Sequence, residues 1–400
     1  MANKILDKQS ILLLAVQAMF VTATALSGTF IPVYLWKSSE SYMVIGFFTL
    51  LQYICGGFTF WIAGKWVKQK NKMNVLRLGM ALCGVFYCVV LWLGDQAVHY
   101  IFVLGTLQGI ALGFFWLAFN VIYFEITSPE NRDRYNGWAG LLGSGAGIIA
   151  PWLSGFLITT LKGEAGYRFI FTVSLIIFIA GAILSFWLEK RPPKGVYNWT
   201  HGWQQLKQKG NDWRRLFPAI AAQGVREGVF MFLVGLTVYT ATSDESKVGF
   251  YALVTSFVAF ISFWAAGRWM KEKYRSTAMF IGAVMTTVVI IPLFWELSFN
   301  RLLIFGIGVS LFMPLYSIPM TSKVFDMIGQ NEKSVQEREE YVVLREAALM
   351  IGRVTGLAAY FAVMAINDSA TAITWLLFAV GAVPIISWWI MRYFFKYKKV

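Results

Sequence analysis

The stretch Ala63-Gly64-Lys65-Trp66-Val67-Lys68-Gln69-Lys70-Asn71-Lys72 recurs 203 residues later as Ala266-Gly267-Arg268-Trp269-Met270-Lys271-Glu272-Lys273-Tyr274-Arg275. Both copies follow an apolar run and carry a cluster of basic residues. Three further pairs of segments keep this spacing to within two residues: Val44–Phe48 with Lys247–Tyr251, Gly79 with Gly282, and Tyr123–Glu125 with Val324–Asp326. Chance repetition seldom keeps its register over so long a stretch, so we predict an internal duplication into two related halves.

The composition excludes a soluble protein. Of the 400 residues, 58% are hydrophobic and only 14% are charged, whereas an average globular protein has about 25% charged residues. Too few charged side chains are present to cover the surface of a soluble chain of this size. The apolar runs are continuous and long, which predicts an all-α polytopic membrane protein and excludes an outer-membrane barrel.

Twelve runs have the length, about 20 residues, that a helix needs to cross the hydrocarbon core of a bilayer. They cover residues 11–33, 43–64, 75–93, 99–124, 137–160, 167–189, 215–240, 247–268, 276–296, 300–323, 340–366 and 369–392. Two six-helix bundles are predicted, over residues 1–189 and 215–400. Between them, 190–214 form a polar connector, in which Trp199, Trp203 and Leu206 share one face of a short amphipathic helix.

Basic residues set the predicted orientation. With the N-terminus in the cytoplasm, 27 of the 35 Lys and Arg residues lie in or beside the cytoplasmic segments, and 5 lie on the opposite side. The remaining three, Arg226, Arg345 and Arg353, fall within spans. We therefore expect both termini in the cytoplasm. The same asymmetry accounts for most of the net charge of +14, so nucleic acid is not an expected partner.

The twelve spans and the loops between them resemble the major facilitator superfamily over essentially the whole chain. The loop Gly64–Lys72 resembles that family's basic loop motif, although Val67 or Lys68 stands where the motif has an Asp. Pro129–Gly137 is close to the family's loop between spans 4 and 5. Ala150–Gly155 resembles the signature of its proton-coupled exporters, with Ala and Ser replacing two glycines.

Two segments narrow the resemblance to a Gram-positive branch of the superfamily, the YqgE type. These are Arg226–Gly228 and the run Glu340–Arg353. The resemblance implies the major facilitator fold, a bacterial cell membrane as the location, and a central cavity. Spans 1, 2, 4 and 5 of the first half and 7, 8, 10 and 11 of the second would line that cavity.

Five ionisable residues lie deep in the predicted spans: Arg226 and Glu227 in span 7, and Arg345, Glu346 and Arg353 in span 11. Such charges cost several kcal/mol in a bilayer unless they are paired, which makes them candidates for function. Glu346 and Arg353 are seven residues apart and therefore share one helix face. The resemblance implies that both spans face the cavity.

Two interpretations of this charged group remain open. It is a structural network that locks span 7 against span 11, or Glu227 or Glu346 takes up a proton. In the second case the arginines hold substrate or stabilise the ionised carboxylate. Apolar surroundings favour a protonated carboxyl group and a neighbouring arginine favours an ionised one, so such a pair can switch when its access to water changes.

The first half has no charged residue at comparable depth. Its candidates for the substrate cavity are polar and aromatic: Gln17, Gln52, Gln108, Asn120, Trp116 and Trp138. A neutral, aromatic half and a charged half together suit an amphiphilic substrate. The expected gating residues lie in loops and at span ends, and are Gly64, Lys65, Lys68, Arg132, Gly267, Arg268, Glu125 and Asp326. We expect Glu125 and Asp326 to pair with basic residues of the loops.

The leading hypothesis is secondary transport by alternating access, in the form of proton-coupled export of a small or amphiphilic solute. The alternatives are a facilitator or symporter, or a flippase for an anionic or lipid-linked solute. A membrane-embedded enzyme is a further class. However, the two histidines, His99 and His201, and the three cysteines form no catalytic or metal-binding pattern. The sequence also contains no Walker motif for binding ATP. We therefore expect no enzyme activity, no metal and no cofactor. The expected partners are a small-molecule substrate, a proton as the coupling ion and membrane lipid, and the expected state is a monomer.

Overall fold

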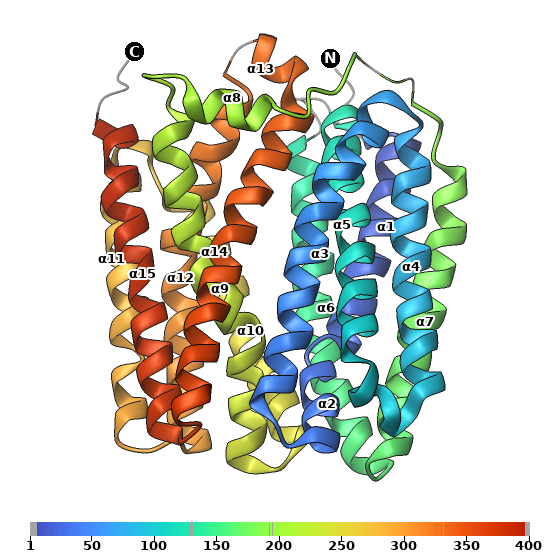
Figure 1. Cartoon of the computed structure of the whole chain (residues 1–400), viewed down its shortest axis with the longest axis vertical. Coiled ribbons are helices and arrows are strands. Elements are labelled where there is room, and N and C mark those ends of the chain that lie inside the picture. The colour runs from blue at the N-terminus through green and yellow to red at the C-terminus, as the bar shows by residue number, and fades with distance from the viewer. Residues whose placement is uncertain (1–5, 128–131, 192, 194, 331, 397–400) are drawn as a thin grey trace. The chain divides into compact units, whose positions relative to one another are not determined.

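The computed structural model describes residues 6–127, 132–191, 193, 195–330 and 332–396, and only the backbone of residues 132, 133, 333 and 396. The described residues form α-helices and short 3-10 helices (η) (Figure 1). The α-helices are α1 (Lys8–Ser27), α2 (Ile31–Ser39), α3 (Tyr42–Gln69), α4 (Lys72–Leu93), α5 (Ile101–Ile126), α6 (Arg132–Thr160), α7 (Glu164–Leu184), α8 (His201–Lys207), α9 (Trp213–Thr242), α10 (Glu245–Trp269), α11 (Arg275–Val288), α12 (Phe299–Ile328), α13 (Glu332–Gln336), α14 (Arg338–Ile366) and α15 (Ala370–Lys396).

Long apolar helices confirm the predicted all-α, multi-pass membrane fold. Eleven continuous helical stretches of the described chain are long and apolar enough to cross a membrane. One of them, Lys72–Ile126, has 55 residues and contains both α4 and α5. These two helices are joined by the 3-10 helix η1 (Gly94–Tyr100), and Gly94 ends α4 at a φ of 53°, which a glycine adopts without strain. The stretch therefore supplies two spans, which makes twelve.

The first span differs from its prediction because it is broken. The sequence predicts one helix over 11–33, whereas α1 ends at Ser27 and α2 begins at Ile31. Pro32 lies in the first turn of α2, where its missing N–H costs least. The helical stretch continues to Ser39, six residues beyond the predicted end.

The described residues form two compact units. Unit 1 comprises Met1–Trp199 and Asp244–Leu253, and unit 2 comprises Thr200–Ser243 and Val254–Val400. The predicted division into bundles over residues 1–189 and 215–400, with a connector over 190–214, stays a prediction. Within the connector, α8 forms the short helix His201–Lys207.

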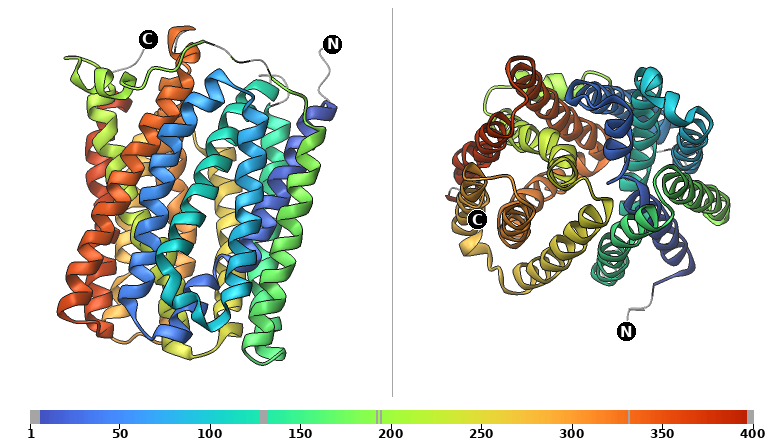
Figure 2. Two further views of the ribbon diagram at one scale, coloured as in Figure 1. Left: turned by 45° about the vertical axis from the view of Figure 1, so that its right-hand side comes forward. Right: turned by 90° about the horizontal axis from the view of Figure 1, so that it is seen from below.

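The same packing pattern occurs within each unit, which confirms the predicted pair of six-helix repeats. In unit 1, α1 packs against α6 and α7, and α4 packs against α5 and α7. In unit 2, α9 packs against α14 and α15, and α11 packs against α12 and α15 (Figure 2). Counted in span order, α1 corresponds to α9, α4 to α11, α5 to α12, α6 to α14 and α7 to α15. Each of these four contacts thus appears once in each unit.

Candidate functional site

Glycines bring α9 and α14 into backbone contact in unit 2. Gly224 and Gly228 lie four residues apart on α9, and Gly352 and Gly356 do so on α14. A β-carbon added to Gly228 would lie 2.5 Å from the carbonyl oxygen of Arg353. One added to Gly352 would meet the carbonyl of Ala221. Small residues at this spacing let two helices approach closely in a membrane, so the side chains beside them meet across the interface.

At this crossing, Arg353 contacts two carboxylates at once. Its Nη1 donates to Glu346 Oε1 at 2.7 Å on α14, and its Nη2 donates to Glu227 Oε2 at 3.0 Å on α9. The amide of Gln223 donates to the other oxygen of Glu227 at 2.7 Å. The side chain of Arg353 is 21% exposed, that of Glu227 is 24% exposed and that of Glu346 is 14% exposed. We call Glu227, Arg353 and Glu346 the charged triad.

The other two charged residues predicted for this site have aromatic neighbours. Arg226 is buried, its guanidinium lies 4.2 Å from the ring centre of Phe230, and its Nη1 is 3.4 Å from Met313 Sδ. The guanidinium of Arg345 lies 5.6 Å from the ring centre of Phe325. Ion pairs therefore join three of the five predicted residues.

The polar candidates of the first half lie in unit 1, on different helices. Tyr135 of α6 donates a hydrogen bond of 3.0 Å to Gln17 Oε1 on α1. Gln108 is half-buried on α5, and its Oε1 has no hydrogen-bond partner among the described residues. Trp116 packs edge-on against Phe20 at 5.3 Å, and Trp138 is 46% exposed. Two further candidates are half-buried on α3 and α5, namely Gln52 and Asn120.

Two ion pairs occupy equivalent places in the repeats. Lys72 Nζ lies 2.6 Å from Glu125 Oε1 where α4 begins and α5 ends, and Arg275 Nη1 lies 3.6 Å from Asp326 Oδ2 where α11 begins and α12 ends. The first pair is buried, with side chains 1% and 4% exposed. In the second pair the arginine is 26% and the aspartate 58% exposed.

The remaining gating candidates differ between the units. In unit 1, Gly64 lies under the ring of Tyr197, Lys65 Nζ is 5.8 Å from the ring centre of Trp199, and Lys68 is buried. In unit 2, the equivalent Gly267 has open space where a β-carbon would lie, and Arg268 is exposed. The side chain of Arg132 lies outside the described residues, as do residues 128–131 of the predicted loop between spans 4 and 5.

Sequence reasoning missed three kinds of residue at these sites. Gln223, which orients Glu227, has no distinguishing pattern. Lys72 and Arg275 could have been found, because they keep the offset of 203 and their acidic partners keep one of 201. The α9–α14 glycines carry a small-xxx-small spacing that predicts close helix packing.

Removing the positive charge from the triad should destabilise the protein. We expect Arg353→Met to lower the free energy of unfolding by about 2 kcal/mol, because it leaves two partly buried carboxylates beside each other. The triple variant Glu227→Gln/Glu346→Gln/Arg353→Met should recover most of this loss, since it removes all three charges of the triad. Thermal unfolding in detergent measures both, and a triple variant no more stable than Arg353→Met would contradict the electrostatic explanation.

Comparison with known proteins gives the family. A model of the Major Facilitator Superfamily matches residues 13–334. The chain is 33% identical over 395 residues to a protein of Bacillus subtilis (strain 168) described as uncharacterized protein YqgE, covering 98% of this chain and 91% of that protein. It is 41% identical over 165 residues to an uncharacterized protein encoded in the sodM 3' region of Geobacillus stearothermophilus, covering 41% of this chain and 77% of that protein.

Solved structures share the fold. A bacterial homologue of the iron transporter ferroportin matches in an outward-facing state with a TM-score of 0.69 and 14% identity, and in an inward-facing state with 0.68 and 13%. Each match covers 97% of this chain and 99% of the other. At this identity the likeness concerns the fold alone. The family model and the near full-length match to YqgE are decisive, and the chain belongs to the major facilitator superfamily, in the YqgE-type branch.

Proposed function

We propose that this protein is a proton-coupled secondary transporter that exports a small or amphiphilic solute by alternating access, with the charged triad as its coupling site. Members of this superfamily are transporters, and two parallel repeats are the architecture in which halves rock around a central site. The proposed location is the bacterial cell membrane, with both termini in the cytoplasm, and the proposed state is a monomer.

The observation that carries this proposal is the double contact of Arg353. One guanidinium serves two carboxylates, so either Glu227 or Glu346 can accept a proton while the other keeps its ion pair. Protonation removes the charge that holds Arg353 on that side, and its hydrogen bond then weakens. All three side chains are partly exposed, as residues that exchange a proton with the cavity must be.

Export is supported by the resemblance of Ala150–Gly155 to the exporter signature, and this segment packs closely against α10. Gly155 of α6 lies so near α10 that a β-carbon on it would be 2.5 Å from the carbonyl oxygen of Glu245. Reciprocally, a β-carbon on Gly249 would be 2.7 Å from the carbonyl oxygen of Pro151. These contacts lie within unit 1. The segment thus packs helices through small residues, as a degenerate exporter signature would.

A facilitator or flippase for an anionic solute is the second candidate. Arg345 favours it, because among the described residues its guanidinium group contacts the ring of Phe325 and pairs with no carboxylate. A cation without a carboxylate partner can bind an anionic group of a substrate.

Transport across a pH gradient tests the proposal. Reconstituted protein would be screened with cationic dyes, sugars and amphiphilic anions under a gradient of one pH unit. For a neutral solute exchanged one-to-one with a proton, we expect accumulation up to about tenfold, since one pH unit corresponds to a tenfold equilibrium ratio. Glu227→Gln/Glu346→Gln should reduce this accumulation to none, leaving downhill flux.

The matched control is Glu332→Gln, which makes the same chemical change at an exposed position. It should accumulate the solute like the unmodified protein. Undiminished accumulation by the double Gln variant would refute the coupling role of the triad. If the unmodified protein shows only downhill flux that does not depend on the pH gradient, the facilitator or flippase is favoured.

A further inference from the structure

The repeats differ where α3 meets α5 in unit 1 and α10 meets α12 in unit 2. Three glycines of α5 (Gly105, Gly109 and Gly113) lie against α3, and a β-carbon on Gly105 would be 2.6 Å from the carbonyl oxygen of Phe48. At an offset of 201, the corresponding residues of α12 are Gly306, Ser310 and Pro314. Pro314 stands inside α12, where a proline supplies no backbone N–H for the helical hydrogen bond. A cavity of about 410 Å³ lies between α10, α11 and α12.

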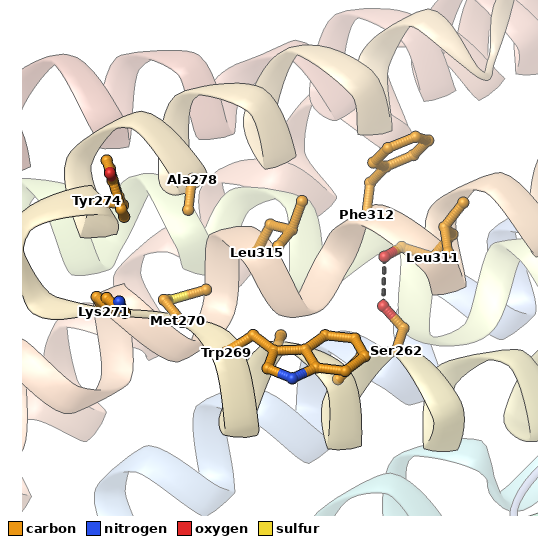
Figure 3. A pocket seen from close by; sticks show the side chains of 11 residues that line it. Ser262, Trp269, Met270, Lys271, Tyr274, Ala278, Leu311, Phe312 and Leu315 are labelled. Carbon is orange, nitrogen blue, oxygen red and sulfur yellow. Dashed lines mark hydrogen bonds between the residues drawn. The ribbon is translucent and has the colours of Figure 1, made fainter.

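The lining of this cavity is apolar apart from one end. Figure 3 shows Trp269 and Ser262 of α10 opposite Leu311 and Leu315 of α12, with Lys271 and Tyr274 at one end of the cavity. The Ser262 hydroxyl donates to the backbone carbonyl of Leu311 at 2.5 Å, so it is already satisfied. The cavity therefore suits a hydrocarbon chain, and its volume is that of a small-molecule site.

The polar end of the cavity carries positive charge. Lys271 lines the cavity there, and Arg268 and Lys273 are its exposed neighbours in the sequence. Within the described part of the chain none of these three residues pairs with a carboxylate. The one acidic residue among them, Glu272, lies 3.8 Å from Arg275. Beside them, Trp269 is 67% and Tyr274 is 54% exposed, aromatic side chains of the kinds that gather at the membrane–water interface.

In unit 1, residues of the connector pack over the equivalent segment, which begins at Gly64. There the ring of Tyr197 lies over Gly64, at 2.7 Å from the position of a β-carbon, and Trp199 lies beside Lys65. In unit 2, nothing lies within 4 Å of that position on Gly267. The same basic, aromatic segment is thus covered by the connector in one repeat and open in the other.

We infer that the cavity between α10, α11 and α12 binds an anionic phospholipid. Part of one acyl chain fills the apolar cavity, and the headgroup phosphate lies against Lys271, with Arg268 and Lys273 contributing to the positive field. Charge complementarity selects this occupant, since it combines a hydrocarbon chain with a negative charge at the depth of the interfacial aromatics. This site is independent of the charged triad and of the proposed transport activity.

Native mass spectrometry of the full-length protein, with phosphatidylglycerol or phosphatidylcholine added, tests the site. We expect phosphatidylglycerol to remain bound and phosphatidylcholine to bind several-fold more weakly. Lys271→Gln should weaken phosphatidylglycerol binding about fivefold, the effect expected of one basic residue at an anionic headgroup. Ala265→Phe, which fills the cavity without changing charge, should weaken binding of both lipids.

The control for charge is Lys209→Gln, the same substitution at an exposed residue of the connector. It should leave lipid binding unchanged. Thermal unfolding of each variant without added lipid shows whether it is folded. If Ala265→Phe is misfolded, Ala278→Leu, which fills the same cavity, takes its place. Three results would overturn the assignment. The first is equal binding of the two lipids, and the second is that Lys209→Gln weakens phosphatidylglycerol binding as much as Lys271→Gln does. The third result is that soluble glycerol phosphate competes for the site as effectively as phosphatidylglycerol.

Discussion

We expect the substitution Lys72→Met to lower the free energy of unfolding by about 3–5 kcal/mol, the usual cost of removing one partner from a buried ion pair. Lys72 is fully buried and the side chain of Glu125 is 4% exposed, so water cannot take the place of the lost ammonium group. The methionine keeps the length and apolar stem of the lysine, so the loss reports the charge. Equilibrium unfolding of the detergent-solubilised protein by SDS measures it.

The repeat supplies a matched control for this prediction. Arg275→Met removes the equivalent cation, but its partner Asp326 is 58% exposed, so we expect a loss of at most about 1 kcal/mol. The two pairs occupy equivalent positions in the repeats, so the difference between the two losses of stability reports the effect of burial. Losses of equal size in the two variants would show that burial does not determine the energy of these pairs.

Gly352→Val should have an effect of similar size, about 3 kcal/mol or more, because it overpacks the α9–α14 crossing. The new β-carbon would meet the carbonyl of Ala221 and lie 2.8 Å from the Cα of Gly224. Backbone atoms cannot move aside by changing rotamer, so the helices must separate, which also pulls Arg353 away from Glu227. We expect less folded protein on size-exclusion chromatography and a lower unfolding temperature.

Gly140→Val is the control for Gly352→Val, with the identical change in another helix. A β-carbon at Gly140 has nothing within 4 Å, so we expect a change within about 0.5 kcal/mol. If both variants lost the same stability, the cause would be valine in a helix and not the contact with α9.

Most of the fold follows from the sequence because spans and repeats have strong signals. Helix ends do not, because hydropathy locates the hydrocarbon core and not the last hydrogen-bonded turn. The tenth span is predicted to end at 323, yet α12 continues to Ile328. The ninth is predicted to end at 296, yet α11 ends at Val288 and a short 3-10 helix containing Pro292 follows.

The charged triad could be predicted only in part. The seven-residue spacing places Glu346 and Arg353 on one face of a helix, and their side chains are in contact. Which of Arg226 and Glu227 faces α14 depends on the rotation of α9 about its axis, which the sequence of α9 alone does not determine. The glycines at 224 and 228 face α14, and Glu227 lies beside them, whereas Arg226 turns toward Phe230.

The backbone contact between α9 and α14 also separates the motions of the site by timescale. The two helices cannot approach further, so when one carboxylate is protonated, Arg353 shifts toward the other by rotation of its side chain. Rotations of exposed side chains take picoseconds to nanoseconds, whereas collective helix movements take microseconds to milliseconds. If the triad couples transport, its side chains rearrange after each proton transfer long before the helices move. The direction of net flux would then follow the proton concentration on the open side, and the rate of turnover would follow the helices.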